Sequence, residues 1–329
     1  MDFLKDFLAL NPVIPYIVLV VGFVALIKGA DWFVDGSSSV AKKLGIPSVI
    51  IGLTIVAMGT SAPEAAVSIS AALEKNNGIA LGNVIGSNLF NLLIVLGVCM
   101  LITRVPTKKE IITRDFPWNM MATIVVVLLI LDGKISRIEG IILLLMFVSY
   151  IAYLIYGAIK NRAPADESEI GNSSWPVSIM LLIVGITLIV LGGTCVVDSA
   201  ELIATSWGVD PILIGLTIVA CGTSLPELVT SIVAAKKGEC EMAVGNVIGS
   251  NIFNLLFILG TTTTITPITG INLAGGILVD AVLLLGFTQL MLIFSQRESR
   301  FQKQQGGVAV VCYIVYLAYI ILREFAIIF

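Results

Sequence analysis

The chain has 329 residues, of which 57% are hydrophobic and only 12% are charged, with a formal net charge of −3 and no histidine. Because soluble domains carry about 25% charged residues, this composition excludes a soluble globular domain, in agreement with a mean hydropathy of +1.03. The lack of histidine excludes a histidine metal site or proton relay. We expect a lipid bilayer around the chain, with no nucleic acid and no obligate protein partner.

Apolar stretches of about 20 residues, the length that crosses a bilayer, recur along the whole chain. The first twelve residues lack the basic n-region and cleavage site of a signal peptide. We predict an all-α polytopic membrane protein of ten transmembrane helices. In chain order the predicted spans are Val13–Val34, Ile46–Leu73, Gly78–Ile102, Phe116–Leu131, Ile138–Ile159, Pro176–Ile203, Pro211–Ala235, Met242–Thr264, Leu273–Phe294 and Gly307–Phe329.

Lysine and arginine are unevenly divided between the two sets of alternate loops. One set holds 13 of the 19 basic residues and the other side holds five, while Lys28 lies inside the first span. Cytoplasmic loops carry the excess of basic residues. The pattern therefore predicts a cell-membrane protein with both termini on the extracytoplasmic side, which agrees with an even number of spans.

The longest polar interruption divides the chain into two halves. Residues 161–175 are rich in Pro, Gly, Ser and acidic residues, a composition typical of a solvated linker. We predict a first five-helix repeat over residues 1–160, a cytoplasmic linker over 161–175 and a second five-helix repeat over 176–329. The five cysteines form no CxxC pair, and we interpret them as small core residues rather than disulfides or metal ligands.

A shift of 163 residues superimposes two copies of one element. Ile51–Gly97 and Ile214–Gly260 share 30 identical residues over 47 positions without a gap. Both copies contain the motifs GTSxPE and GNVIGSNxFN in the same register. Because each half has an odd number of spans, the second copy should enter the membrane in the opposite sense. This predicts the inverted-topology repeat of secondary transporters.

Each GTSxPE motif predicts a broken helix, in the second and the seventh span. Pro63 and Pro226 have no amide hydrogen, so the carbonyl four residues earlier loses its helical partner. Such a break survives in lipid only where protein, water or an ion satisfies it. Glu64 and Glu227 follow the prolines directly, and a carboxylate within a membrane span indicates an ion or proton pathway. A lone proline is more often a simple kink, but the same group in both halves favours an ion site.

Polar residues at helical spacing form one face of each motif's helix and one face of the next span in each half. Their carbonyl, hydroxyl, amide and carboxylate oxygens suit hard cations such as Ca²⁺ and Na⁺. Two carboxylates balance the charge of one Ca²⁺ or two Na⁺. The stripes comprise Ala57, Thr60, Ser61, Glu64 and Ser68, their counterparts Ala220, Thr223, Ser224, Glu227 and Ser231, and the sets Asn83, Ser87, Asn91 and Asn246, Ser250, Asn254.

These paired motifs, the ten spans and the short linker resemble the cation/Ca²⁺ exchanger superfamily, in particular its prokaryotic sodium/calcium exchanger-like members. The resemblance covers nearly the whole chain and implies that Glu64 and Glu227 are the central Ca²⁺ ligands. Asn91 matches the family's asparagine in the third span, whereas Asn254 stands where many members have aspartate. The resemblance further implies ligand roles for the carbonyls of Thr60, Thr223, Ala57 and Ala220 and for the side chains of Ser61, Ser224, Ser87 and Ser250.

The predicted function is Na⁺/Ca²⁺ antiport by alternating access, which an inward Na⁺ gradient would drive towards Ca²⁺ extrusion. The resemblance implies that the first and sixth spans slide against the other eight. We expect no enzyme activity and no cofactor apart from the transported Ca²⁺ and Na⁺. Exchange of H⁺ for Ca²⁺, with Glu64 and Glu227 titrating, stays open as the nearest alternative, and a cation channel is a more distant one. Asn254 leaves the coupling stoichiometry open.

Overall fold

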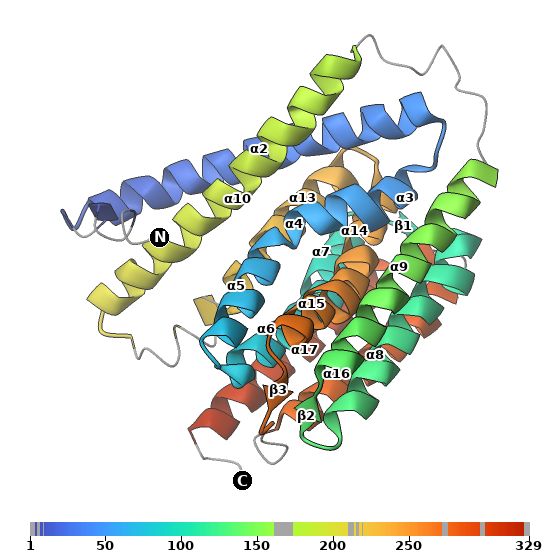
Figure 1. Cartoon of the computed structure of the whole chain (residues 1–329). Helices are drawn as coiled ribbons and strands as arrows, with labels where there is room; N and C mark the ends of the chain where they lie inside the picture. Colours follow the sequence, from blue (N-terminus) through green and yellow to red (C-terminus); the bar gives the residue numbers. More distant parts are fainter. Residues whose placement is uncertain are drawn as a thin grey trace.

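The computed structural model describes residues 10–160, 174–209, 220–271, 276–296 and 300–325, together with residues 4, 7, 8, 214, 217 and 218. The described chain is helical apart from four two-residue strands (Figure 1). The helical segments are α2 (Ile14–Leu44), α3 (Ser48–Ile51), η1 (Gly52–Val56), α4 (Ala57–Thr60), α5 (Ala62–Leu73), α6 (Asn77–Phe90), η2 (Asn91–Val95), α7 (Leu96–Ile102), η3 (Ile111–Asp115), α8 (Phe116–Ile130), α9 (Arg137–Lys160), α10 (Trp175–Ser206), α12 (Ala220–Gly222), α13 (Leu225–Lys236), α14 (Cys240–Ile252), η5 (Phe253–Ile258), α15 (Leu259–Ile265), α16 (Ile277–Gln296) and α17 (Lys303–Glu324), where η marks a π-helical segment. The strands are β1 (Val105–Pro106), β2 (Lys134–Ile135), β3 (Ile268–Thr269) and β4 (Arg300–Phe301).

Eight helices within the described residues are long and apolar enough to cross a membrane, and a bent pair, Ser48–Thr60 with Ala62–Leu73, gives a ninth. These helices confirm a helical membrane protein. The predicted span Pro211–Ala235 falls partly outside the described residues, and its described part forms α12 and α13. Nearly all of the predicted linker, residues 161–173, also lies outside the description. The tenth span and the division into two repeats therefore stay predictions.

α2 is nine residues longer than its predicted span of 22 residues, and α10 is four residues longer than its predicted span of 28 residues. α2 has 31 residues and α10 has 32, which at 1.5 Å per residue corresponds to about 46–48 Å. A hydrocarbon core is about 30 Å thick, so these helices are tilted or extend beyond it. α2 continues past the predicted end at Val34 because Lys42 and Lys43 complement the carboxyl end of a helix and Gly45 caps it with φ of 65°.

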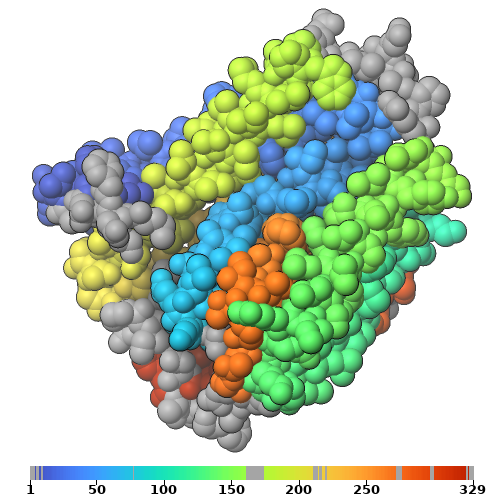
Figure 2. All heavy atoms as spheres, viewed as in Figure 1, coloured from blue at the N-terminus to red at the C-terminus, as the bar shows by residue number. Residues whose placement is uncertain are grey.

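α2 and α10 pack against each other along glycines spaced seven residues apart. A Cβ added to Gly29 would lie 2.8 Å from the carbonyl oxygen of Gly185, and one on Gly22 would lie 3.1 Å from that of Gly192. Because the earlier glycine of α2 meets the later glycine of α10, the two helices run antiparallel. Small residues let helix backbones approach closely in membranes. Figure 2 shows α10 as a diagonal yellow-green ridge beside the blue atoms of α2.

Two short strand pairs join distant turns of the chain. β1 pairs antiparallel with β4, with Val105 opposite Phe301, and β2 pairs antiparallel with β3, with Ile135 opposite Ile268. In Figure 1, β2 and β3 lie together at the lower end, whereas β1 lies towards the upper right. Val105 and Ile268 match under the shift of 163, so matched strands close different ends of the helical body.

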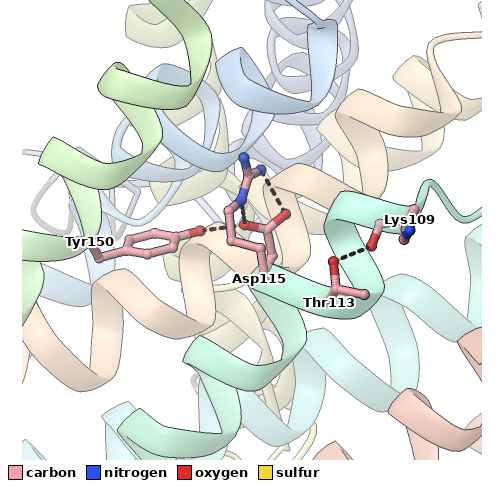
Figure 3. Close-up of polar contacts among 5 residues, drawn as sticks. Lys109, Thr113, Asp115 and Tyr150 are labelled. Carbon is pink, nitrogen blue, oxygen red and sulfur yellow. Dashed lines mark hydrogen bonds and ion pairs between the residues drawn. The ribbon is translucent and has the colours of Figure 1, made fainter. Parts of the chain in front are cut away.

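A buried ion pair lengthens the fourth span at its amino end. The membrane-length helix begins at Ile111, five residues before the predicted start at Phe116. Arg114 Nε lies 2.7 Å from Asp115 Oδ1, and Tyr150 donates a 3.3 Å hydrogen bond to the same oxygen (Figure 3). Asp115 is fully buried. The two charges compensate each other, so residues that read as a loop continue the helix.

Lys237, in the turn after α13, ties that turn to α2. Its Nζ lies 2.7 Å from Asp31 Oδ1 and 2.6 Å from Asp35 Oδ1. Ser38 of α2 and Glu239 of the same turn are hydrogen-bonded at 2.5 Å. Asp35 thus takes part in a structural contact, and its partner Lys237 lies 202 positions later in the chain.

Candidate functional site

Both GTSxPE motifs interrupt a helix in the structure. The second span bends by 47° at the break between α4 and α5, where Ser61 lies outside both helices. Thr223 and Ser224 form the corresponding turn between α12 and α13. Pro63 and Pro226 occupy the first turn of the helix that follows, where a missing amide hydrogen removes no helical bond. The predicted breaks are therefore confirmed within the described residues.

The two breaks face each other through crossed hydrogen bonds. Ser61 Oγ donates a 2.7 Å bond to Glu227 Oε1, and Ser224 Oγ donates a 2.8 Å bond to Glu64 Oε1. The two bonds exchange places under the shift of 163. Both carboxylates are fully buried and lie in the first turn of α5 or α13, where the positive end of the helix dipole favours negative charge.

Asn83 of α6 and Asn246 of α14 support this arrangement from the side. Asn83 Nδ2 donates to Ser68 Oγ at 2.9 Å and to the carbonyl oxygen of Glu64 at 3.2 Å. Asn246 Nδ2 donates to Ser231 Oγ at 2.9 Å and to the carbonyl oxygen of Glu227 at 3.4 Å. Each asparagine thus holds the backbone and the helix face of the glutamate in its own half.

The threonines of the two motifs complete the cross-connection. Thr60 Oγ1 donates to Asn246 Oδ1 at 3.1 Å, and Thr223 Oγ1 donates to Asn83 Oδ1 at 3.5 Å. Ser250 Oγ donates a long 3.5 Å bond to the carbonyl oxygen of Ala57. Ala220 begins α12, and its side chain lies outside the description. The bonds of Thr60, Thr223 and Ser250 each join one half of the chain to the other.

Several buried oxygens of these residues have no hydrogen-bond partner within the described structure. Native proteins pair nearly all buried polar atoms, so each exception calls for a physical explanation. A hard cation, which binds six to eight oxygens when it is Ca²⁺, would satisfy this set without any donor. The unpaired oxygens are Glu64 Oε2, Glu227 Oε2, Ser87 Oγ, Asn91 Oδ1 and Asn254 Oδ1.

The donor set contains only two acids. Within the described residues, no cluster of three or more His, Cys, Asp or Glu side chains could hold a metal ion. A site on Glu64 and Glu227 must therefore draw its other ligands from neutral hydroxyl, amide and carbonyl oxygens. Such a mixed oxygen set suits Ca²⁺ and Na⁺ better than a transition metal, which prefers nitrogen or sulfur.

The α2–α10 pair covers both breaks. A Cβ added to Gly59 would lie 3.1 Å from Phe33 of α2 and 3.0 Å from Ile186 of α10. On the other break, a Cβ on Gly222 would clash with the side chain of Val197 of α10. The α2–α10 pair thus lies against the glycine that precedes each break.

The sequence interpretation missed part of the supporting network. It placed Asn83 and Asn246 on the polar face but not in the site, and it assigned no role to Asn88 and Asn251. These last two residues are joined by reciprocal hydrogen bonds across the halves. Their match under the shift of 163, inside GNVIGSNxFN, was the available signal, because two copies of a buried amide rarely persist without a partner.

Comparisons with known proteins agree on one family. A model of the sodium/calcium exchanger protein family matches residues 14–156 and 177–322. Antiporter CaxA of Alkalimonas amylolytica is 38% identical over 311 residues, covering 91% of this chain and 96% of that protein. The sodium/calcium exchanger MaX1 of Methanosarcina acetivorans is 29% identical over 341 residues, covering 92% and 97%. A solved structure of the sodium-calcium exchanger NCX_Mj, soaked with 2.5 mM Na⁺ and 10 mM Sr²⁺, matches with a TM-score of 0.83 at 31% identity, covering 94% of this chain and 99% of that one.

Proposed function

The chain belongs to the sodium/calcium exchanger family, and we propose that it exchanges Na⁺ for Ca²⁺ through a shared site on Glu64 and Glu227. The observation that carries this proposal is the pair of crossed bonds from Ser61 and Ser224. They bring two buried carboxylates together and engage one oxygen of each. The other oxygen of each carboxylate has no partner in the described structure and is available to a cation.

Charge balance explains how such a site couples two ions. Two carboxylates carry a charge of −2, which one Ca²⁺ or two Na⁺ would neutralise. A buried charge is costly unless it is paired. The conformational change that exposes the site to the other side of the membrane would therefore be unfavourable while the two carboxylates hold no cation. Because Ca²⁺ and Na⁺ use the same two carboxylates, they compete. Competition for one site makes transport an exchange rather than a leak.

Alternating access would come from the α2–α10 pair. The pair covers both breaks through Phe33, Ile186 and Val197. Its two helices meet at Gly22, Gly29, Gly185 and Gly192, here called the glycine seam, where the glycines carry no side chain that would block a shift of one helix along the other. The antiparallel course of α2 and α10, and the contacts that repeat under the shift of 163, support an inverted repeat of two five-helix halves. Secondary transporters built in this way place their ion sites between the repeats and rock one element against another.

Orientation and direction follow from the same proposal. The excess of basic residues in one set of loops supports a cell-membrane protein whose basic loops and linker lie in the cytoplasm. Both termini would then lie on the extracytoplasmic side. With Na⁺ entering down its gradient, the exchanger would extrude Ca²⁺ from the cytoplasm. The family is one of transporters, so the ions are substrates and the reaction forms or breaks no covalent bond.

The test is uptake of ⁴⁵Ca²⁺ into proteoliposomes that contain the purified protein. Vesicles loaded with Na⁺ and diluted into Na⁺-free buffer should accumulate Ca²⁺, whereas vesicles with equal Na⁺ on both sides should not. A pH gradient imposed in the absence of Na⁺ should produce no uptake above protein-free vesicles. Uptake driven by the pH gradient alone would replace Na⁺ by H⁺ as the coupling ion. Ca²⁺ entry that needs neither gradient would point to a channel.

A further inference from the structure

We propose that Asn88, which the cation site itself does not contain, is a positioning residue that turns the Asn254 amide so that its oxygen faces the cation. The inference rests on the proposed function, because it assumes that Asn254 lines the shared Na⁺/Ca²⁺ site. Asn88 lies on α6 and Asn254 lies 166 residues later on η5. Both side chains are fully buried.

The orientation of the Asn88 amide is fixed by a backbone carbonyl. Asn88 Nδ2 donates a 3.2 Å bond to the carbonyl oxygen of Asn251, and Asn251 Nδ2 returns a 3.2 Å bond to the carbonyl oxygen of Asn88. A carbonyl oxygen accepts hydrogen bonds and cannot donate them. The NH₂ group of Asn88 must therefore face Asn251, and its Oδ1 must face the opposite way.

That orientation determines the orientation of Asn254. Asn88 Oδ1 accepts a 3.1 Å bond from Asn254 Nδ2, and Asn254 can supply a donor only through its NH₂ group. The Asn254 oxygen is then left on the other side of the amide, where it has no partner within the described structure. An amide turned by 180° would present NH₂ donors to a cation and oppose binding.

The matching contact in the other half is not made. Asn91, the counterpart of Asn254 under the shift of 163, has no partner for either amide atom in the described structure, and neither has Asn251 Oδ1, the counterpart of Asn88 Oδ1. No hydrogen bond in the described structure therefore fixes the orientation of the Asn91 amide, whereas one bond fixes that of Asn254. The asymmetry assigns the orienting function to Asn88 and not to Asn251, although the two residues share their reciprocal backbone bonds.

This difference supplies a matched pair of variants. Asn88→Ala removes one bond to a carbonyl and also the acceptor for Asn254, whereas Asn251→Ala removes one bond to a carbonyl only. The readout is the Ca²⁺ concentration that gives half-maximal Na⁺-driven ⁴⁵Ca²⁺ uptake. Loss of a residue that orients a metal ligand weakens metal binding by about 10–100-fold. We expect about a tenfold increase for Asn88→Ala and less than about a twofold change for Asn251→Ala.

The variant Asn254→Asp tests whether Asn88 acts by orienting the side chain at position 254 or only by packing against it. Both ends of a carboxylate are oxygens, so Asn254→Asp presents an oxygen to the cation whichever way it is turned. Asn88→Ala should therefore shift the half-maximal Ca²⁺ concentration by less than about twofold in the Asn254→Asp background. An equal shift in both backgrounds, or an equal effect of Asn88→Ala and Asn251→Ala, would overturn the proposal.

A second variant at position 88 and the uptake by the unmodified protein distinguish a folding defect, a failure of the proposed exchange and a failure of the Asn88 assignment. If Asn88→Ala is not recovered folded, Asn88→Leu takes its place because it keeps the side-chain volume without an acceptor. Loss of folding in both would overturn a positioning function in favour of a structural one. Absence of Na⁺-driven uptake by the unmodified protein would refute the proposed exchange. Normal uptake with no difference between Asn88→Ala and Asn251→Ala would refute only the assignment to Asn88.

Discussion

Ser61 and Glu227 are joined by a 2.7 Å hydrogen bond although 166 positions separate them in the sequence. The bond engages Oε1 of the Glu227 carboxylate, and Oε2 has no hydrogen-bond partner in the described structure. Its counterpart from Ser224 to Glu64 does the same for the other carboxylate. Each hydroxyl therefore orients the carboxylate of the other motif, and neither motif makes these bonds alone.

Replacement of Ser61 by alanine should weaken Ca²⁺ binding without removing exchange. A hydrogen bond to a charged group contributes about 1.5–3 kcal/mol, and 1.4 kcal/mol corresponds to a factor of about ten. We expect the half-maximal Ca²⁺ concentration for uptake to rise by about tenfold. Ser70→Ala is the matched control, because Ser70 lies on the exposed side of the same helix α5. Identical Ca²⁺ dependence in the two variants would contradict an orienting hydroxyl.

Removal of one carboxylate should abolish exchange. Glu64→Gln keeps the size of the side chain but leaves a single negative charge to balance Ca²⁺, so ⁴⁵Ca²⁺ uptake should fall by about a hundredfold or to the level of empty vesicles. Glu74→Gln makes the same substitution at the exposed end of α5 and should leave uptake unchanged. Exchange by Glu64→Gln at the unmodified rate would place the cation site elsewhere.

The sequence was sufficient to predict the features that depend on local chemistry. Pro63 and Pro226 cannot continue a helical ladder, and both motifs interrupt helices in the structure. Glu64 and Glu227 are costly in a membrane and stand next to those prolines. The shift of 163 also indicated that the two motifs belong together, because identical polar groups at one register rarely arise in apolar helices by chance.

Features that depend on partners distant in the sequence could not be predicted in the same way. The charges at Arg114 and Asp115 read as a loop, since only the fold brings Tyr150 to the same carboxylate. Asn88 gave no sign of its function because its role depends on which atoms of Asn251 and Asn254 it meets. Beyond Val34, α2 combines its own terminal residues Lys42, Lys43 and Gly45 with packing of Gly36 against α10, and only the fold reveals the packing.

Loss of the buried acid in the fourth span should lower stability more than loss of an exposed one. Asp115→Ala would leave Arg114 without its partner in a largely buried position, and breaking a buried ion pair costs about 3–5 kcal/mol. The thermal unfolding midpoint of the purified protein in detergent should fall by at least about 5 °C. The Asp132–Lys134 pair is 3.9 Å long with both side chains more than half exposed, so Asp132→Ala should cost less than about 1 kcal/mol. Equal midpoints for the two variants would show that the buried pair adds no stability.

A methyl group in the glycine seam should slow exchange while leaving the cation site intact. In Gly29→Ala the new Cβ would lie 2.8 Å from two backbone atoms of α10, the Gly185 oxygen and the Ile189 nitrogen, so α2 and α10 would have to separate. Overpacking of this kind costs about 1–3 kcal/mol, and a pair that must slide past the added methyl should meet a higher barrier. The maximal rate of Na⁺-driven ⁴⁵Ca²⁺ uptake should fall at least about fivefold, with the half-maximal Ca²⁺ concentration changed by less than about twofold, because Glu64 and Glu227 are untouched.

The matched control for this variant is Gly286→Ala in α16, where an added Cβ has no described atom within 4 Å. Alanine also favours a helix over glycine by about 1 kcal/mol, so the control should fold at least as well as the unmodified protein and transport at the same rate. A slow rate in both variants would mean that any methyl on a lipid-spanning helix impairs the protein. A normal rate in Gly29→Ala would mean that α2 and α10 do not move against each other along this seam during exchange.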